Sequence, residues 1–186
     1  QITRLTLNPT WTVPPTILQQ DKLPLIREDA GYLARHGMRV LDAQGNDLDP
    51  ASIDWHAPRN IMLRQEAGPA NPLGQVAIRF ANPFSVYLHD TPSKPLFDLS
   101  ERALSSGCVR VEGALQLVDL LLDEDERETV ARLLQTGKTH EYRLARRTPI
   151  LMAYWTAAVD DTGQLRYRPD IYQRDAALLR ALDAAR

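Results

Sequence analysis

The sequence predicts one domain built mainly of β-strands with added α-helices. The chain has 186 residues, which lies within the roughly 100–200 residues that one domain usually takes. Its 44% hydrophobic and 25% charged residues are typical of a globular domain with a buried core. Short apolar runs between Gly, Pro and Asn indicate strands, and two stretches with a 3.6-residue apolar period indicate helices.

The first zone of the chain is rich in proline and is predicted to be a strand followed by a small helical insert. A strand is predicted at Ile2–Leu7, and the prolines of residues 8–15 then interrupt regular structure. Two short helices follow, with Pro24 in the first turn of the second and Gly37 at its end. The remaining expected elements here are a strand at 38–41, a turn at 44–47 and a capped helical turn at 49–52.

The second zone is predicted to be more regular. A helical stripe over residues 112–122 and another over 124–134 predict two helices, or one helix kinked at Asp123. A turn at 161–163 and a terminal helix at 175–185 close the chain. The expected strands of this zone are 61–65, 75–80, 85–89, 139–145, 150–159 and 164–168.

Charge and apolar patterning exclude several classes of function. The chain has 22 Lys and Arg against 24 Asp and Glu, so it has no basic surplus for nucleic acid or anionic lipid. Its longest apolar stretch, residues 150–159, is far shorter than the roughly 20 residues that span a bilayer. The lone Cys108 cannot form an internal disulfide, and no Cys/His spacing predicts a zinc site. We therefore expect no metal, no cofactor, no nucleic acid and no membrane segment within this chain.

The residues around Cys108 are those a thiol nucleophile needs. Nucleophilic attack requires thiolate character, which a nearby imidazole or a group of backbone N–H donors supplies by stabilising the anion. His89 ends an apolar strand nineteen positions before Cys108, and Ser105, Ser106 and Gly107 allow a tight turn that aims N–H groups at one point. The alternative interpretation is a small buried cysteine that begins a helix.

Asp90 follows His89 directly, which suggests a Cys-His-Asp triad. A side chain can rarely bend back to orient the ring of the preceding residue, so we expect the backbone carbonyl of Asp90 to hold His89.

Three motifs, in this order, resemble the L,D-transpeptidase catalytic domain of the YkuD type. They are Asn-Pro-Leu-Gly at 71–74, Tyr-Leu-His-Asp-Thr at 87–91 and Ser-Ser-Gly-Cys-Val-Arg at 105–110. The sequence of residues 8–14 and 64–97 is similar to the long-insert branch of this family in Gram-negative bacteria, the YcbB type. Where most members carry His two positions before the cysteine, this chain has Ser106.

The resemblance implies a YkuD-type fold over residues 1–186, a β-sandwich or barrel-like catalytic domain with a helical substrate-capping insert and a C-terminal helix. The insert, residues 8–56, is expected to be a lid without a core of its own, because it is small and broken by prolines. Its Trp11, Tyr32 and Trp55 would then need another surface to cover. Strands or a wall-binding region are expected to precede Gln1.

The resemblance also assigns roles to individual residues. Cys108 is the implied nucleophile and His89 the base; the carbonyl of Asp90 orients His89, and the N–H of Gly107 binds the oxyanion. The residues implied to bind substrate are Arg110, Tyr87, Ser106 and Asn71. A planar guanidinium such as that of Arg110 suits a substrate carboxylate.

The implied reaction forms 3→3 cross-links between peptidoglycan stem peptides in the periplasm. The cysteine would attack the bond between meso-diaminopimelate and D-alanine, form a thioester and pass the acyl group to another diaminopimelate, and carbapenems would inhibit it. With water as acceptor the protein would be an L,D-carboxypeptidase, and with a lipoprotein lysine an anchoring enzyme. Two other classes stay open, an inactive peptidoglycan-binding module and a cysteine peptidase of another fold, although papain-like peptidases place Cys before His.

Overall fold

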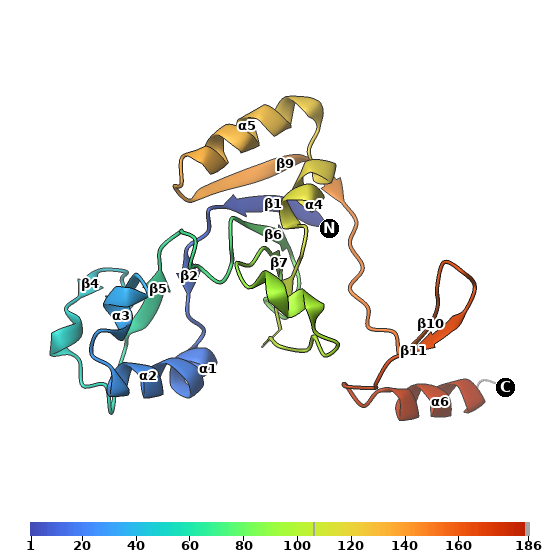
Figure 1. Ribbon diagram of the computed structural model, residues 1–186, viewed down its shortest axis with the longest axis horizontal. Helices are drawn as coiled ribbons and strands as arrows, with labels where there is room; N and C mark the ends of the chain where they lie inside the picture. The colour runs from blue at the N-terminus through green and yellow to red at the C-terminus, as the bar shows by residue number, and fades with distance from the viewer. Residues whose placement is uncertain (106, 185–186) are drawn as a thin grey trace. The chain divides into compact units, whose positions relative to one another are not determined.

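The computed structural model describes residues 1–105 and 107–184. The chain forms two compact units, Gln1–Pro149 and Ile150–Arg186 (Figure 1). All of the predicted site residues lie in the first unit.

A five-stranded mixed sheet forms the centre of the first unit. Its order is β8-β7-β6-β1-β9. β1 pairs antiparallel with β6 and β9, β6 pairs antiparallel with β7, and β7 pairs parallel with β8. The strands are β1 (Ile2–Leu7), β6 (Val76–Phe80), β7 (Leu88–His89), β8 (Val109–Arg110) and β9 (His140–Thr148). The predicted combination of strands with helices is confirmed, and within the described residues the sheet is open, with β8 and β9 at its edges.

Two helices pack on this sheet. α4 (Ala114–Leu121) contacts β6 and β9, and α5 (Glu124–Gln135) contacts β1 (Figure 1). Asp123 separates the helices because it caps α5 in a capping box, in which the Glu126 carboxylate accepts the N–H of Asp123 at 3.0 Å. The predicted break at Asp123 is therefore confirmed as two helices.

The predicted insert contains a second sheet as well as helices. Its strand order is β2-β5-β3-β4, with β2 (Trp11–Thr12), β3 (Met38–Leu41), β4 (Asp47–Leu48) and β5 (Met62–Gln65). The helical segments are α1 (Pro15–Ile17), η1 (Leu18–Lys22), α2 (Leu23–Glu28), α3 (Tyr32–Arg35) and η2 (Pro50–Ser52). The segment from β2 to β5 is called the small lobe below.

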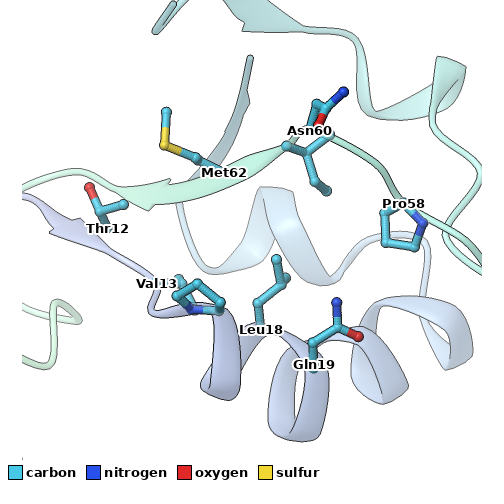
Figure 2. Close-up of a pocket in the computed structure, with 9 residues that line it drawn as sticks. Thr12, Val13, Leu18, Gln19, Pro58, Asn60 and Met62 are labelled. Atoms are coloured by element: carbon cyan, nitrogen blue, oxygen red, sulfur yellow. The ribbon is translucent and has the colours of Figure 1, made fainter. Parts of the chain in front are cut away.

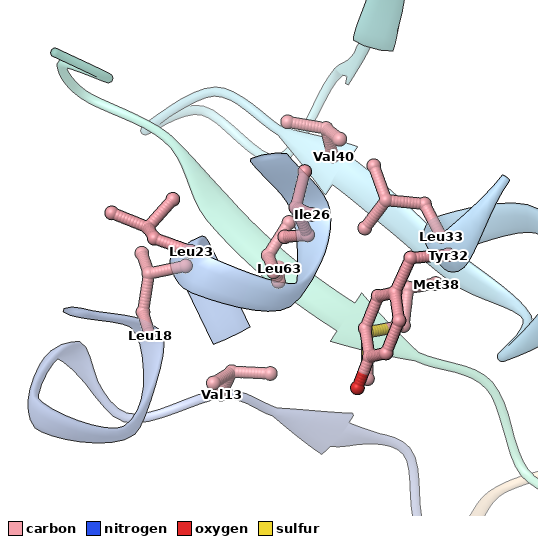
Figure 3. Packing of buried hydrophobic residues seen from close by; sticks show 9 residues of the cluster. All are labelled: Val13, Leu18, Leu23, Ile26, Tyr32, Leu33, Met38, Val40 and Leu63. Atoms are coloured by element: carbon pink, nitrogen blue, oxygen red, sulfur yellow. The ribbon is translucent and has the colours of Figure 1, made fainter. Parts of the chain in front are cut away.

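The small lobe has a hydrophobic core of its own, so the expectation that the insert lacks a core was wrong. The cluster comprises Val13, Leu18, Leu23, Ile26, Tyr32, Leu33, Met38, Val40 and Leu63 (Figure 3). The physical reason is that β5, which lies beyond the predicted end at residue 56, pairs with β2 and β3 and places the fully buried Leu63 against the helices. Prolines do not prevent this, because Pro15 and Pro24 stand in the first turns of α1 and α2.

A hollow of about 270 Å³ lies in the small lobe between η1 and the entry to β5 (Figure 2). Its walls include Val13, Leu18, Gln19, Asn60 and Met62. None of the predicted catalytic or substrate-binding residues lines it, so this hollow is not the predicted active site.

Replacing Leu63 by alanine tests whether the small lobe depends on its core. Leu63 is fully buried in the cluster, so we expect Leu63→Ala to lower the free energy of unfolding by about 2–5 kcal/mol. Urea unfolding followed by tryptophan fluorescence measures the effect. Leu25→Ala on α2 is the control, because Leu25 is 42% exposed and its truncation leaves no cavity. Equal losses in the two variants would contradict a packed core around Leu63.

Residues 150–184 contain a hairpin and a helix. The elements are β10 (Ala157–Val159), β11 (Leu165–Tyr167) and α6 (Asp175–Ala184). The Asp160 carboxylate accepts the N–H groups of Thr162 and Gln164 and fixes the predicted turn. The strand expected over 150–159 forms only at its last three residues, where β11 pairs with it. In the part of the chain that the structure describes, no helix has the length and apolarity to cross a membrane.

Candidate active site

The candidate site is built on the pairing of β7 with β8. The two strands run parallel, with Leu88 opposite Val109 and His89 opposite Arg110. The N–H of Val109 donates to the carbonyl of Tyr87 at 3.0 Å, and the N–H of Val111 donates to the carbonyl of His89 at 2.8 Å. These bonds hold the chain around Cys108 beside the strand that ends in His89.

Strand pairing places two of the candidate side chains on one face. Paired residues of neighbouring strands share a side of the sheet, so His89 and Arg110 lie on the same side. Tyr87 contacts the Cys108 thiol, and its ring centroid lies 5.9 Å from that of His89. The fold thus brings Cys108 next to Tyr87, whose ring lies near that of the predicted base.

His89 is buried and held in one tautomer. Its Nδ1 lies 2.5 Å from the carbonyl oxygen of Asp90. Because a carbonyl only accepts, Nδ1 carries the proton and donates, which leaves Nε2 as the basic nitrogen. The predicted contact with the Asp90 carbonyl is confirmed.

The ionisation of His89 is shifted towards the neutral form. Burial lowers its pKa, and the positive charges of Arg110 and Arg79 lower it further, whereas the hydrogen bond to Asp90 opposes them. A neutral imidazole at neutral pH is the form that accepts a proton from a thiol.

Cys108 is partly exposed and directly precedes β8. It does not begin a helix, so the alternative of a buried helix-start cysteine was wrong. The Ser105 hydroxyl donates to the carbonyl of Cys108 at 2.7 Å and accepts the N–H of Gly107 at 3.3 Å. The turn is tight because Gly107 has a φ of +138°. The N–H predicted to bind an oxyanion is thus held by Ser105 in this structure. Ser106 lies outside the described residues.

Tyr87 lies against both Cys108 and Arg79. Burial raises the pKa of the Tyr87 hydroxyl and the adjacent Cys108 thiol raises it further, while Arg79 acts in the opposite direction. The guanidinium carbon of Arg79 stands 3.8 Å from the centroid of the Tyr87 ring, and its Nε donates to the Thr6 hydroxyl at 3.2 Å. Tyr87 therefore presents a protonated hydroxyl to the Cys108 thiol, and Arg79 packs on its ring.

Arg110 lies beside His89 and supports the loop before Cys108. Its Nη1 donates to the carbonyl of Leu104 at 3.1 Å, and it is partly exposed. Together with Arg79 it gives this face a positive potential, which favours an anionic ligand.

Asn71, the first residue of the Asn-Pro-Leu-Gly motif, holds the loop in which it lies. The buried Asn71 amide donates to the carbonyls of Pro9 at 2.9 Å and Glu66 at 3.0 Å, and its oxygen accepts the N–H of Leu73 at 2.9 Å. Asn71 is only 1% exposed, and its side chain is occupied by these backbone contacts. It therefore holds the loop and is not accessible to bind substrate.

Comparison with known proteins decides the family. Residues 1–151 match the YkuD family, which is described as the L,D-transpeptidase catalytic domain. The chain belongs to this L,D-transpeptidase family. A protein of Haemophilus influenzae named "Putative L,D-transpeptidase" is 37% identical over 183 residues, which cover 94% of this chain. The chain spans about a third (36%) of the length of that relative.

The matched L,D-transpeptidase region contains every predicted site residue, but three contributors to the site were not predicted. They are Arg79, the carboxylate of Asp90 and Gly74. The Asp90 carboxylate accepts the N–H of Gln75 at 3.0 Å, and Gly74 lies directly against it. Burial opposes the ionisation of Asp90, but hydrogen bonds from Lys94, Gln75 and Thr91 outweigh it and lower its pKa. The one feature of the sequence that could have predicted this contact is Gly74 at the end of the Asn-Pro-Leu-Gly motif, because a glycine there permits a positive φ and a close approach.

Gly74 is expected to be irreplaceable in this L,D-transpeptidase domain. Its φ is +59°, and a Cβ there would approach the Asp90 Cβ to 2.7 Å and overlap its carboxylate. We expect Gly74→Ala to lower the free energy of unfolding by more than the roughly 1–3 kcal/mol of backbone strain alone. Gly37→Ala is the matched control, because Gly37 has a φ of +57° and open space around it. Thermal unfolding of both variants measures the difference, and equal losses would contradict the overlap with Asp90.

Proposed function

We propose that this chain is a cysteine acyltransferase that cross-links peptidoglycan stem peptides. The observation that supports the proposal is the parallel pairing of the strand that ends in His89, whose pKa is lowered, with the strand that Cys108 directly precedes. His89 Nε2 takes the thiol proton as the sulfur attacks the carbonyl between diaminopimelate and D-alanine. The C–N bond breaks, His89 returns the proton to the leaving amine, and a thioester on Cys108 remains.

The second half of the reaction transfers the acyl group to an amine. The side-chain amine of another diaminopimelate gives a 3→3 cross-link, and His89 accepts its proton while the Cys108 thiol is regenerated. Diaminopimelate and D-alanine bear carboxylates, and the positive charges of Arg110 and Arg79 suit such groups. The Tyr87 hydroxyl, which lies next to the Cys108 thiol, would donate a hydrogen bond to the oxyanion.

Three alternative functions are distinguished by the products formed from muropeptides. Water as acceptor makes an L,D-carboxypeptidase, a lipoprotein lysine makes an anchoring enzyme, and no turnover makes an inactive peptidoglycan-binding module. A periplasmic location and inhibition by carbapenems are parts of the same proposal. The chain covers only 36% of the length of its Haemophilus relative, so properties of the whole protein are proposed here and not observed.

Muropeptides separate these outcomes. Incubation with a purified tetrapeptide muropeptide is expected to give a dimer that has lost one D-alanine, detected by mass spectrometry. A tripeptide monomer alone would support the carboxypeptidase, and a product with an added lysyl peptide would support the anchoring enzyme. An unchanged muropeptide, with Cys108 unlabelled by a carbapenem, would overturn the proposal.

We also propose that the small lobe limits the access of water to the thioester. An enclosed site favours an amine over water as acceptor. Leu63→Ala loosens the lobe without changing any candidate site residue. We expect this variant to release a larger share of hydrolysed tripeptide relative to dimer. A stability loss with an unchanged product ratio would assign the lobe a purely structural role.

A further inference from the structure

One ammonium group joins the two strands that carry the candidate base and nucleophile. Lys94 opens η3 (Lys94–Asp98), a short helical turn after the His89 strand. Its Nζ lies 2.6 Å from Asp90 Oδ1 and 2.9 Å from the carbonyl oxygen of Glu112. Asp90 follows β7 and Glu112 comes two residues after β8, so Lys94 bridges the ends of both strands.

The two acceptors are themselves tied to the site. The Asp90 side chain is 12% exposed and its other oxygen accepts the N–H of Gln75, so its position is fixed. The carbonyl of the same residue holds His89 Nδ1. On the other strand, Glu112 follows Val111, whose N–H donates to the His89 carbonyl. A displacement of Asp90 or Glu112 would therefore move the imidazole relative to Cys108.

Stability is a weak explanation for this arrangement. The Lys94 side chain is 48% exposed, and half-exposed ion pairs contribute little to the free energy of folding. We propose that Lys94 is a positioning residue of the proposed acyl transfer, which clamps Asp90 and Glu112 so that the base and nucleophile strands keep their register. This inference rests on the proposed function for its kinetic consequence but not for its geometry.

The clamp also sets the charges near the imidazole. The charges that act on the His89 ring are those of Arg110 and Arg79, which lower its pKa, and of Asp90, which raises it. The Tyr87 ring stands 5.9 Å away and is neutral. Without the Lys94 cation beside it, the Asp90 carboxylate would raise the pKa of His89 with only the two arginines acting against it.

The experiment compares Lys94→Met, Lys94→Arg and the control Lys138→Met. Lys138 is exposed and remote in sequence from both strands. NMR titration of the His89 ring is expected to move to higher pH in Lys94→Met, by about half a pH unit or more. The wild-type midpoint is expected in Lys94→Arg and Lys138→Met. Lys94→Met should also lower kcat for dimer formation by ~10- to 100-fold, because small misplacements of reacting groups are costly.

A wild-type titration in Lys94→Met, or the same shift in Lys94→Arg, would overturn the clamp. Thermal unfolding checks that the variants fold, and Lys94→Gln replaces the methionine variant if that one does not. The titration and the rate of Cys108 alkylation by iodoacetamide need no muropeptide. A wild-type protein inactive on muropeptides would thus refute the proposed function while the titration still decides the role of Lys94.

Discussion

Replacing Cys108 by serine is expected to lower the rate of dimer formation by about 10⁴-fold or more. The hydroxyl of serine is a far weaker acid than a thiol, and His89 alone cannot supply the missing anion. Mass spectrometry of the muropeptide products measures the loss. In the same samples, a carbapenem is expected to add once to the wild-type protein and not to Cys108→Ser.

The stability of Cys108→Ser makes this prediction specific. Cys108 is partly exposed and its backbone carbonyl, not its side chain, accepts the Ser105 hydroxyl. We therefore expect the free energy of unfolding to stay within about 0.5 kcal/mol of the wild type. Equal carbapenem labelling of the two proteins would place the nucleophile elsewhere.

Replacing His89 by glutamine is expected to lower kcat/KM by about 10²–10⁴-fold, the usual contribution of a general base. In the wild type, activity should fall only below pH 6.5, because burial and the two arginines lower the pKa of His89 from 6.5. The glutamine variant should lose that acid limb. A pH profile unchanged by the substitution would remove His89 from the role of base.

Stability should depend on pH through the same residue. As pH falls below 6.5, the unfolded chain binds a proton at this histidine before the folded chain does, so the free energy of unfolding decreases. Above pH 6.5 His89 is neutral in both states and adds no penalty to folding. The penalty develops as pH falls from 6.5 to the lower pKa of the folded chain, and it is complete below that pKa. Urea unfolding at pH 7 and pH 5 is expected to show a smaller decrease in His89→Gln than in the wild type.

Neighbours along the chain were enough to predict most local elements and to single out the two candidate reactive residues. A partly alternating apolar run predicted β6, and two helical stripes on either side of Asp123 predicted the break between α4 and α5, because these signals depend on neighbours along the chain. Cys108 and His89 stood out because few side chains suit nucleophilic attack. The contact of His89 with the Asp90 carbonyl also followed from covalent connectivity alone.

The pairing of the strands and the contacts between distant charged side chains depend on the folded chain. β5 was expected as a strand, but its pairing with β2 and β3 is set by hydrogen bonds to residues far away in sequence, so its place in the small lobe and the core around Leu63 were missed. The short β8 exists because β7 supplies its partners. Arg79 and Lys94 resemble ordinary surface charges in the sequence, because a long charged side chain carries no local pattern that predicts its contact with the Tyr87 ring or with the Glu112 carbonyl.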